Sequence, residues 1–153
     1  MKRRNVLKVI AVLAAGLAIP AFVASYRAFA GGTQPFSATY RFPLITTTHD
    51  GYYWVWTGTG SGSFVGNSSY VASGHITSKK ALFIATITAA NGDSLNLEGM
   101  QTWQADTQTW VGPFTIIGGT GRFANATGGG TVTSMAADTQ GTEIDVYDGT
   151  ISF

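Results

Sequence analysis

A cluster of glycines in the last third of the chain constrains the fold more than any other feature. The stretch Phe114–Val132 alternates as a strand does, breaks at Gly118, Gly119 and Gly121, and then resumes as a strand. Glycine accepts positive φ and close backbone approach, so this spacing predicts a tight corner, with positive φ expected at Gly119 and Gly121. Phe123 lies inside the corner. We expect its ring to fold under the sheet and close one end of the core.

The same glycines could be taken for a phosphate-binding loop. Such a loop follows a strand and opens a long helix, whose N-terminus holds the phosphate. Here only about one helical turn fits before Gly128–Gly130, and no lysine follows the last glycine. The corner is therefore interpreted as a structural turn and not as a nucleotide site.

Residues 1–30 have the pattern of an export signal. Basic residues come first, Val9–Ala24 is apolar, and Ala28–Ala30 has the small-x-small pattern that signal peptidase cleaves. Arg3 and Arg4 open a twin-arginine pattern, and an ordinary secretory leader with adjacent arginines is the alternative. We expect cleavage before Gly31, export to the bacterial periplasm or beyond the cell, and no membrane association after cleavage.

Loss of the leader changes the charge of the protein. The full chain has nine basic and eight acidic residues and a formal charge of +1. Five of the basic residues lie in the leader, so residues 31–153 keep Arg41, Lys79, Lys80 and Arg122 against eight acids, a formal charge of −4. This balance argues against a nucleic-acid partner. The chain has no cysteine, which excludes a disulfide framework and a thiolate metal site.

Residues 31–153 are long enough for one compact domain, and strand-like segments recur between turn signals at the spacing of a sandwich or barrel. Eight strands are predicted: Pro35–Phe42, Tyr52–Thr59, Tyr70–Thr77, Ala81–Ala89, Ser94–Met100, Trp110–Gly118, Thr127–Ala136 and Glu143–Phe153. Asn91 and Gly92 predict a type I′ hairpin between the fourth and fifth strands. The last strand can pair with the first, which predicts an all-β, eight-stranded antiparallel β-barrel.

Three motifs carry a family resemblance: Ala-Ala-Asn-Gly-Asp at 89–93, Gly-Gly-Thr-Gly-Arg-Phe-Ala-Asn-Ala-Thr-Gly at 118–128, and Gly-Thr-Ile-Ser-Phe at 149–153. They resemble the allene oxide cyclase barrel-like superfamily, above all its exported bacterial members of unassigned function, and the corner also resembles that of plant dirigent proteins. The resemblance implies an eight-stranded barrel with a largely apolar central cavity and, in the plant members, a homotrimer. The catalytic residues of the cyclase and of the dirigent proteins find no position-by-position match, so no catalytic residue is assigned.

Aromatic residues mark one strand. Tyr52, Trp54 and Trp56 share one face of it, and Tyr53 and Val55 share the other, so one of the two sets points outward. An outward Tyr-Trp-Trp row indicates a subunit interface or a strip on which carbohydrates or polymers stack. An inward row indicates a ring-lined ligand cavity, or rings that only fill a small barrel.

Few polar residues are candidates for chemistry. His49 lies in a turn and is expected to be solvated, and His75 has no second histidine at ligand spacing, so no metal site is predicted. Glu98 is solvated if its neighbouring leucines fill the lumen, and it is the strand-centre carboxylate of the lumen if they do not. The candidate ligand contacts are Tyr40, Trp54, Trp56, His75 and Glu98.

Three functions stay open. The chain is expected to be a non-enzymatic, exported barrel that binds a small hydrophobic or aromatic molecule in its lumen, without cofactor. The alternatives are a cofactor-free cyclase or isomerase, which the resemblance favours, and a structural or interaction barrel, for which a homo-oligomer is one expectation. A buried ionisable group inside an open lumen would favour catalysis, whereas a completely filled barrel would leave only the structural role.

Overall fold

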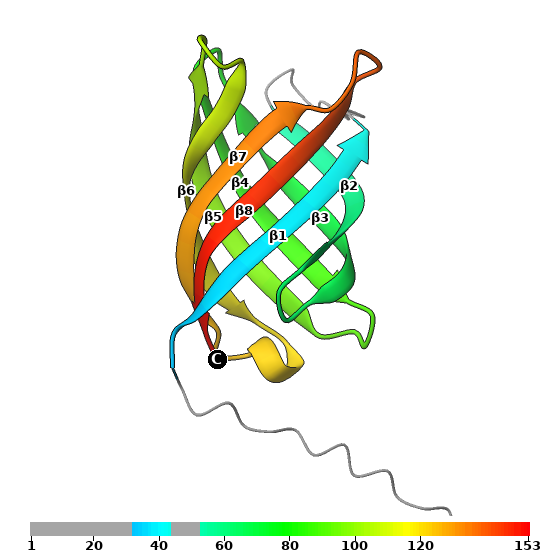
Figure 1. Ribbon diagram of the computed structural model, residues 1–153, viewed down its shortest axis with the longest axis vertical. Coiled ribbons are helices and arrows are strands. Elements are labelled where there is room, and N and C mark those ends of the chain that lie inside the picture. Colours follow the sequence, from blue (N-terminus) through cyan, green and yellow to red (C-terminus); the bar gives the residue numbers. More distant parts are fainter. Residues whose placement is uncertain (1–31, 44–52) are drawn as a thin grey trace, which may run out of the picture.

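The computed structural model describes residues 32–43 and 53–153, so the predicted leader, His49 and Tyr52 lie outside the described residues. The chain forms a closed antiparallel barrel of eight strands in sequence order (Figure 1). The strands are β1 (Gln34–Pro43), β2 (Tyr53–Gly62), β3 (Gly66–Ile76), β4 (Lys80–Ala89), β5 (Ser94–Gln104), β6 (Thr109–Gly119), β7 (Thr127–Ala136) and β8 (Thr142–Ser152), with one 3₁₀ turn, η1 (Gly121–Phe123), after β6. No helix within residues 32–43 and 53–153 has the length and apolar character that a membrane-spanning helix needs.

The first and last strands close the barrel, as the sequence predicts. β1 pairs with β8 over ten positions, from Gln34 opposite Ile151 to Pro43 opposite Thr142. β1 pairs with β2 over four positions only, from Ala38 to Arg41. Closure removes the free strand edges that an open sheet would expose. The seam between β1 and β2 has the shortest pairing in the wall.

Alternation of side chains along each strand places the core inside the barrel. On β1 the buried residues are Phe36, Ala38, Tyr40 and Phe42, and the residues between them are exposed. Successive side chains of a strand point to opposite faces of the sheet, so a single apolar set fills the lumen. The apolar set of this strand therefore faces the lumen.

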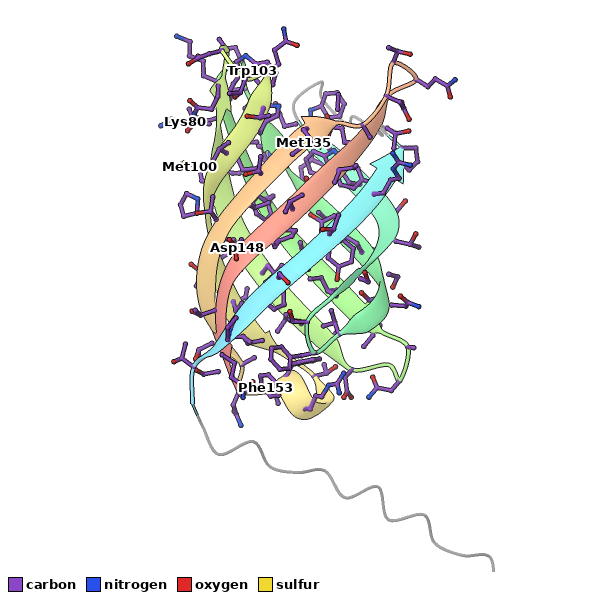
Figure 2. All side chains as sticks on the ribbon, in the orientation of Figure 1. Lys80, Met100, Trp103, Met135, Asp148 and Phe153 are labelled. Carbon is purple, nitrogen blue, oxygen red and sulfur yellow. The ribbon has the colours of Figure 1, made fainter. Side chains whose placement is uncertain are left out.

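The glycine corner seals one end of the barrel, at the bottom of Figure 1, next to the C-terminus. Phe123, in η1, is fully buried, and its ring packs edge-on against Phe153 at a centroid distance of 5.3 Å. Figure 2 shows Phe153 at this same end. The prediction that Phe123 closes the core is confirmed.

The glycines of the corner differ in why they are needed, and one prediction is corrected. Positive φ occurs at Gly118 (105°) and Gly121 (56°), but not at Gly119. The pairing of β5 with β6 shifts between Leu95 and Leu97, so Gly118 lies in a β-bulge, where a left-handed residue is accommodated. Gly119 is required for a different reason: a Cβ there would lie 1.9 Å from the carbonyl oxygen of Ser94.

The hairpin between β4 and β5 also differs from its prediction. Gly92 has a φ of 88°, but Asn91 does not have the positive φ that a type I′ turn requires. The N–H of Gly92 donates to the carbonyl of Ala89 (2.9 Å), and the N–H of Ala89 donates to the carbonyl of Asp93 (2.9 Å). These bonds describe a three-residue loop, a tight turn followed by a left-handed glycine.

This hairpin docks on the corner. The Arg122 guanidinium lies 3.7 Å from the Asp93 carboxylate, and the N–H of Ser94 donates to the Thr120 hydroxyl at 2.9 Å. A Cβ on Gly121 would lie 1.8 Å from the same carboxylate. Two motifs that are far apart in the sequence therefore build a single closed end.

Candidate functional site

A cavity of about 220 Å³ occupies the lumen at the end opposite the corner. Its lining residues come from the halves of the strands that lie toward the β5–β6 and β7–β8 connections, at the top of Figure 1. They are Phe42, Trp54, Trp56, Tyr70, Ala72, Ile76, Ala81, Phe83, Gln101, Trp110, Ser134, Glu143 and Asp145. The barrel is thus filled at one end and hollow at the other.

A layer of tyrosines lies between the cavity and the filled half. The rings of Tyr40 and Tyr70 stack at a centroid distance of 4.8 Å, and Tyr147 meets Tyr40 edge-on at 6.3 Å. All three side chains are almost completely buried. Above them, Ala72 and Ala81 are small inward residues, which leave unfilled the space that larger side chains would occupy.

The hydroxyls of two tyrosines form a hydrogen-bonded group with a buried carboxylate. The Tyr70 hydroxyl donates to Oδ2 of Asp145 at 2.9 Å. The Tyr70 and Tyr147 hydroxyls lie 2.8 Å apart and share a hydrogen bond in which either can donate. This group holds Oδ2 of Asp145 in place.

Two buried polar atoms at the cavity have no hydrogen-bond partner among the described residues. They are Oδ1 of Asp145, whose side chain is 6% exposed, and Nε1 of Trp54. The Ser134 hydroxyl, from the residue opposite Asp145 on β7, accepts a hydrogen bond from the Gln101 amide at 2.6 Å. Buried polar groups are nearly always paired, so an orphaned acceptor and an orphaned donor beside one cavity indicate a site for a ligand.

Burial raises the pKa of both cavity carboxyls toward neutral pH. Desolvation raises the pKa of Asp145 from 3.8 to about 6, against the opposing effect of its hydrogen bonds. Burial, reinforced by the like charge of Asp145, raises the pKa of Glu143 from 4.5 to about 7. Desolvation raises the pKa of Tyr40 to about 12 and those of Tyr70 and Tyr147 well above 10. The tyrosines are therefore neutral donors at physiological pH, while the two carboxyls change charge near it.

The predicted site residues separate into three places. Trp54 and Trp56 line the cavity, so this face of β2 is inward and the outward stacking strip is wrong for them. Tyr40 lies in the layer beneath the cavity and is not among its lining residues. His75 and Glu98 are exposed on the outer surface. The solvated position of Glu98 follows because Leu95 and Leu97 fill the lumen.

His75 and Glu98 both border a shallow groove on the outside of β2–β6, of about 570 Å³. The His75 ring meets Tyr53 edge-on at a centroid distance of 5.3 Å. Leu82 and Ile84, on the outer face of β4, are 55% and 59% exposed. The groove is open to solvent, and its lining is an apolar surface and not a set of reactive groups.

The polar residues of the cavity itself were missed from the sequence. Asp145 and Glu143 lie on the face of β8 that also carries Tyr147 and Ile151, both fully buried. Continuing that apolar face backward along the strand by steps of two would have placed both acids inside. The same rule places Gln101 on the inward face of Leu95 and Leu97.

Within the part of the chain that the structure describes, no group of three or more His, Asp or Glu side chains could hold a metal ion. The cavity offers two carboxyls, two of the several ligands that a divalent cation prefers. The chemistry open to this site is therefore binding through apolar contact and hydrogen bonds, and proton transfer by a carboxyl of raised pKa.

The sequence matches no protein-family model and no curated protein. Among solved structures, the barrel is similar to that of a pterocarpan synthase dirigent protein, with a TM-score of 0.51 and 16% sequence identity over 80% of this chain and 92% of the other. The suspected dirigent-like, allene oxide cyclase-like barrel is thereby supported at the level of the fold. At this identity the similarity assigns no function.

Proposed function

We propose that this chain is a binding protein that holds one small hydrophobic or aromatic molecule in the lumen of a dirigent-type barrel. The carrying observation is the cavity of about 220 Å³, whose lining residues Asp145 and Trp54 each have a buried polar atom without a hydrogen-bond partner among the described residues. An apolar protein cavity of about 150 Å³ can hold benzene, so this one has room for a single ring with a short substituent.

A size series of ligands tests this proposal. We expect alkylbenzenes to change the fluorescence of the cavity tryptophans Trp54, Trp56 and Trp110 in a saturable way, up to a sharp limit of ligand size. Ala72→Leu fills part of the cavity and should abolish the change, whereas Ala105→Leu, at an exposed position, should not. Saturation without a size limit, or equal binding by both variants, would contradict a lumenal site.

A second candidate, a cofactor-free isomerase or cyclase, is favoured by one observation. Asp145 is a buried carboxyl beside an open cavity, with a pKa raised to about 6, which suits a general acid or base near neutral pH. We expect such a residue to exchange protons next to the carbonyl of a small cyclic ketone. Deuterium incorporation from heavy water, followed by NMR and lost in Asp145→Asn, would support catalysis, and no Asp145-dependent exchange would leave binding alone.

A third candidate, an interaction role, is favoured by the outer face of β3–β6. Five large apolar side chains are exposed there: Val71, Leu82, Ile84, Met100 and Ile117. The same face carries both Lys80 and Glu98, so a second copy of the chain offers opposite charge as well as apolar contact. Light scattering should give an oligomer that Ile84→Asp dissociates and Thr131→Asp, on β7, does not. A monomeric parent protein would exclude self-association.

Export is also proposed, from the leader pattern alone. Mass spectrometry of the exported fraction should give a first residue of Gly31, and changing Arg3 and Arg4 together to lysine should block export by the twin-arginine route. Undiminished export of that double variant would assign the leader to the general secretory route.

A further inference from the structure

Among the described residues, the charged side chains that line the cavity are both acidic. Glu143 and Asp145 lie two residues apart on the inward face of β8 and both line the cavity. No Lys, Arg or His of the described residues is among the lining residues. A buried carboxylate without a countercharge is costly, and two of them on one face also repel each other.

The groups around Asp145 do not supply the missing positive charge. Tyr40 on β1, Tyr70 on β3 and Tyr147 on β8 are the titratable groups nearest to it besides Glu143, and burial keeps all three neutral by raising the pKa of each. Ser134, opposite Asp145 on β7, and Gln101 on β5 are uncharged and bonded to each other. One oxygen of the carboxyl, Oδ1, is left without a partner among the described residues.

Aromatic rings make up much of the remaining wall. The face of an aromatic ring carries a negative potential that attracts cations, most strongly for tryptophan and more so where water is excluded. Six rings line the cavity: Phe42, Trp54, Trp56, Tyr70, Phe83 and Trp110. Rings and carboxylates on one wall, with no basic residue among the described lining residues, form the electrostatic complement of an organic cation.

We infer that the cavity takes an organic cation, an ammonium group carried on a small apolar or aromatic body. This inference rests on the proposed lumenal binding and names the chemical class of its ligand. The cation offsets the charge of Asp145 and Glu143 and places its alkyl groups against the tryptophans. A neutral ligand of the same shape gains the apolar contact alone.

A pair of probes of equal shape tests the charge. Benzyltrimethylammonium and neopentylbenzene differ by a nitrogen in place of a carbon and therefore by one positive charge. At about pH 8, above the raised pKa values of both carboxyls, we expect the cation to bind at least about tenfold more tightly. The advantage should disappear by about pH 5, where both carboxyls are protonated. Tryptophan fluorescence and titration calorimetry measure both affinities.

Matched variants of β8 show which carboxylates attract the bound cation. Asp145→Asn and Glu143→Gln should each lower the ratio of cation affinity to neopentylbenzene affinity about tenfold, and far-UV circular dichroism checks that the variants are folded. Asp148→Asn removes an exposed carboxylate on the outer face of the same strand and should change neither affinity. An equal loss of cation binding in Asp148→Asn would mean that the cation is attracted by the negative charge of the protein surface and not by the cavity carboxylates. That result would overturn the inference.

The outcomes separate the two proposals. If neopentylbenzene binds as tightly as the cation at about pH 8, the charge inference is wrong and lumenal binding stands. If neither probe binds and the alkylbenzene series also fails, the proposed function is wrong and the inference falls with it.

Discussion

The two ends of the barrel differ along a single face of β2. Toward the sealed end this face presents Gly58, Gly60 and Gly62, and a Cβ on Gly60 would lie 2.7 Å from the ring of Tyr40. Toward the other end it presents Trp54 and Trp56, which border the cavity. Where one strand has no side chains, rings from its neighbour fill the lumen. Where β2 carries Trp54 and Trp56, and β8 contributes two carboxyls to the same region, the lumen stays hollow.

The comparison shows how one barrel combines stability with a site. The sealed half is filled mainly by aromatic rings, aliphatic chains and close backbone contacts, which favour a rigid, dense core. In the hollow half, one oxygen of the buried Asp145 carboxyl has no hydrogen-bond partner among the described residues, an arrangement that lowers stability. Local instability of this kind is typical of functional sites, and four predictions test the difference between the two halves.

The largest effect is expected from removing the plug of the sealed end. Phe123→Ala should lower the free energy of unfolding by about 3 to 5 kcal/mol, because the ring is fully buried and packed against Phe153. Ile84→Ala, at an outer position that is 59% exposed, is the control and should cost far less. Urea unfolding measures both. A loss below about 1 kcal/mol for Phe123→Ala would contradict the closed end.

The next effect concerns the hollow half and its pH dependence. The folded state raises the pKa of Asp145 from 3.8 to about 6, so it holds the proton more tightly than the unfolded chain does. The resulting stabilisation is complete below about pH 4 and is lost as the pH rises through about 6. Relative to Asp145→Asn, the parent protein should lose about 3 kcal/mol over this window. Unfolding curves that stay parallel across the window would show that Asp145 is not desolvated.

A smaller effect separates strain from contact in the corner. Gly121 and Gly66 have nearly the same φ, 56° and 60°, but an added Cβ meets the Asp93 carboxylate at Gly121 and nothing within 4 Å at Gly66. Gly66→Ala should cost about 1 kcal/mol, from left-handed backbone strain alone. Gly121→Ala should cost more, on the order of 2 to 3 kcal/mol, because the hairpin must also move. Equal losses in urea unfolding would mean that the docking of the hairpin adds nothing.

The smallest effect comes from the same enlargement made in each half. Ala38→Leu, where Ala38 packs against Gly62 in the filled half, should destabilise by about 1 to 3 kcal/mol through overpacking. Ala72→Leu, at the cavity, should stay within about 1 kcal/mol of the parent protein because the added methyl groups enter free space. Thermal unfolding compares the two. A larger loss of stability in Ala72→Leu than in Ala38→Leu would mean that the parent protein has no free space at Ala72.

Much of this architecture could be predicted from the sequence. The alternation on β1 separated its apolar face from its polar face, β8 was predicted as a strand, and their mutual pairing follows from the lack of any other partner for two edge strands. The buried position of Phe123 was predictable because a large apolar ring in a glycine-rich turn is more stable inside the core than in solvent. The position of the left-handed glycine was not, because Gly118 occupies a β-bulge that depends on how β5 pairs with β6.

The candidate site was predictable only in part. Trp54 and Trp56 were found as rings on one face, but the choice of inward or outward was open because both faces of β2 are aromatic. Asp145 and Glu143 were overlooked because β8 alternates acids with Ile144 and Val146, so that near its start the strand looks inverted. Only the fully buried Tyr147 and Ile151, farther along, settle which face is inside.

The sequence by itself determined the strands, their order, the closed glycine end and the lack of thiol chemistry, since each depends on residue types and short-range geometry. The tertiary structure decided that Trp54, Tyr70 and Asp145, from three strands far apart in the chain, border one cavity. It also decided that His75 and Glu98 lie outside. The physical reason is register: inward and outward exchange with a shift of one residue, and the register of a barrel is fixed only when its last strand pairs with its first.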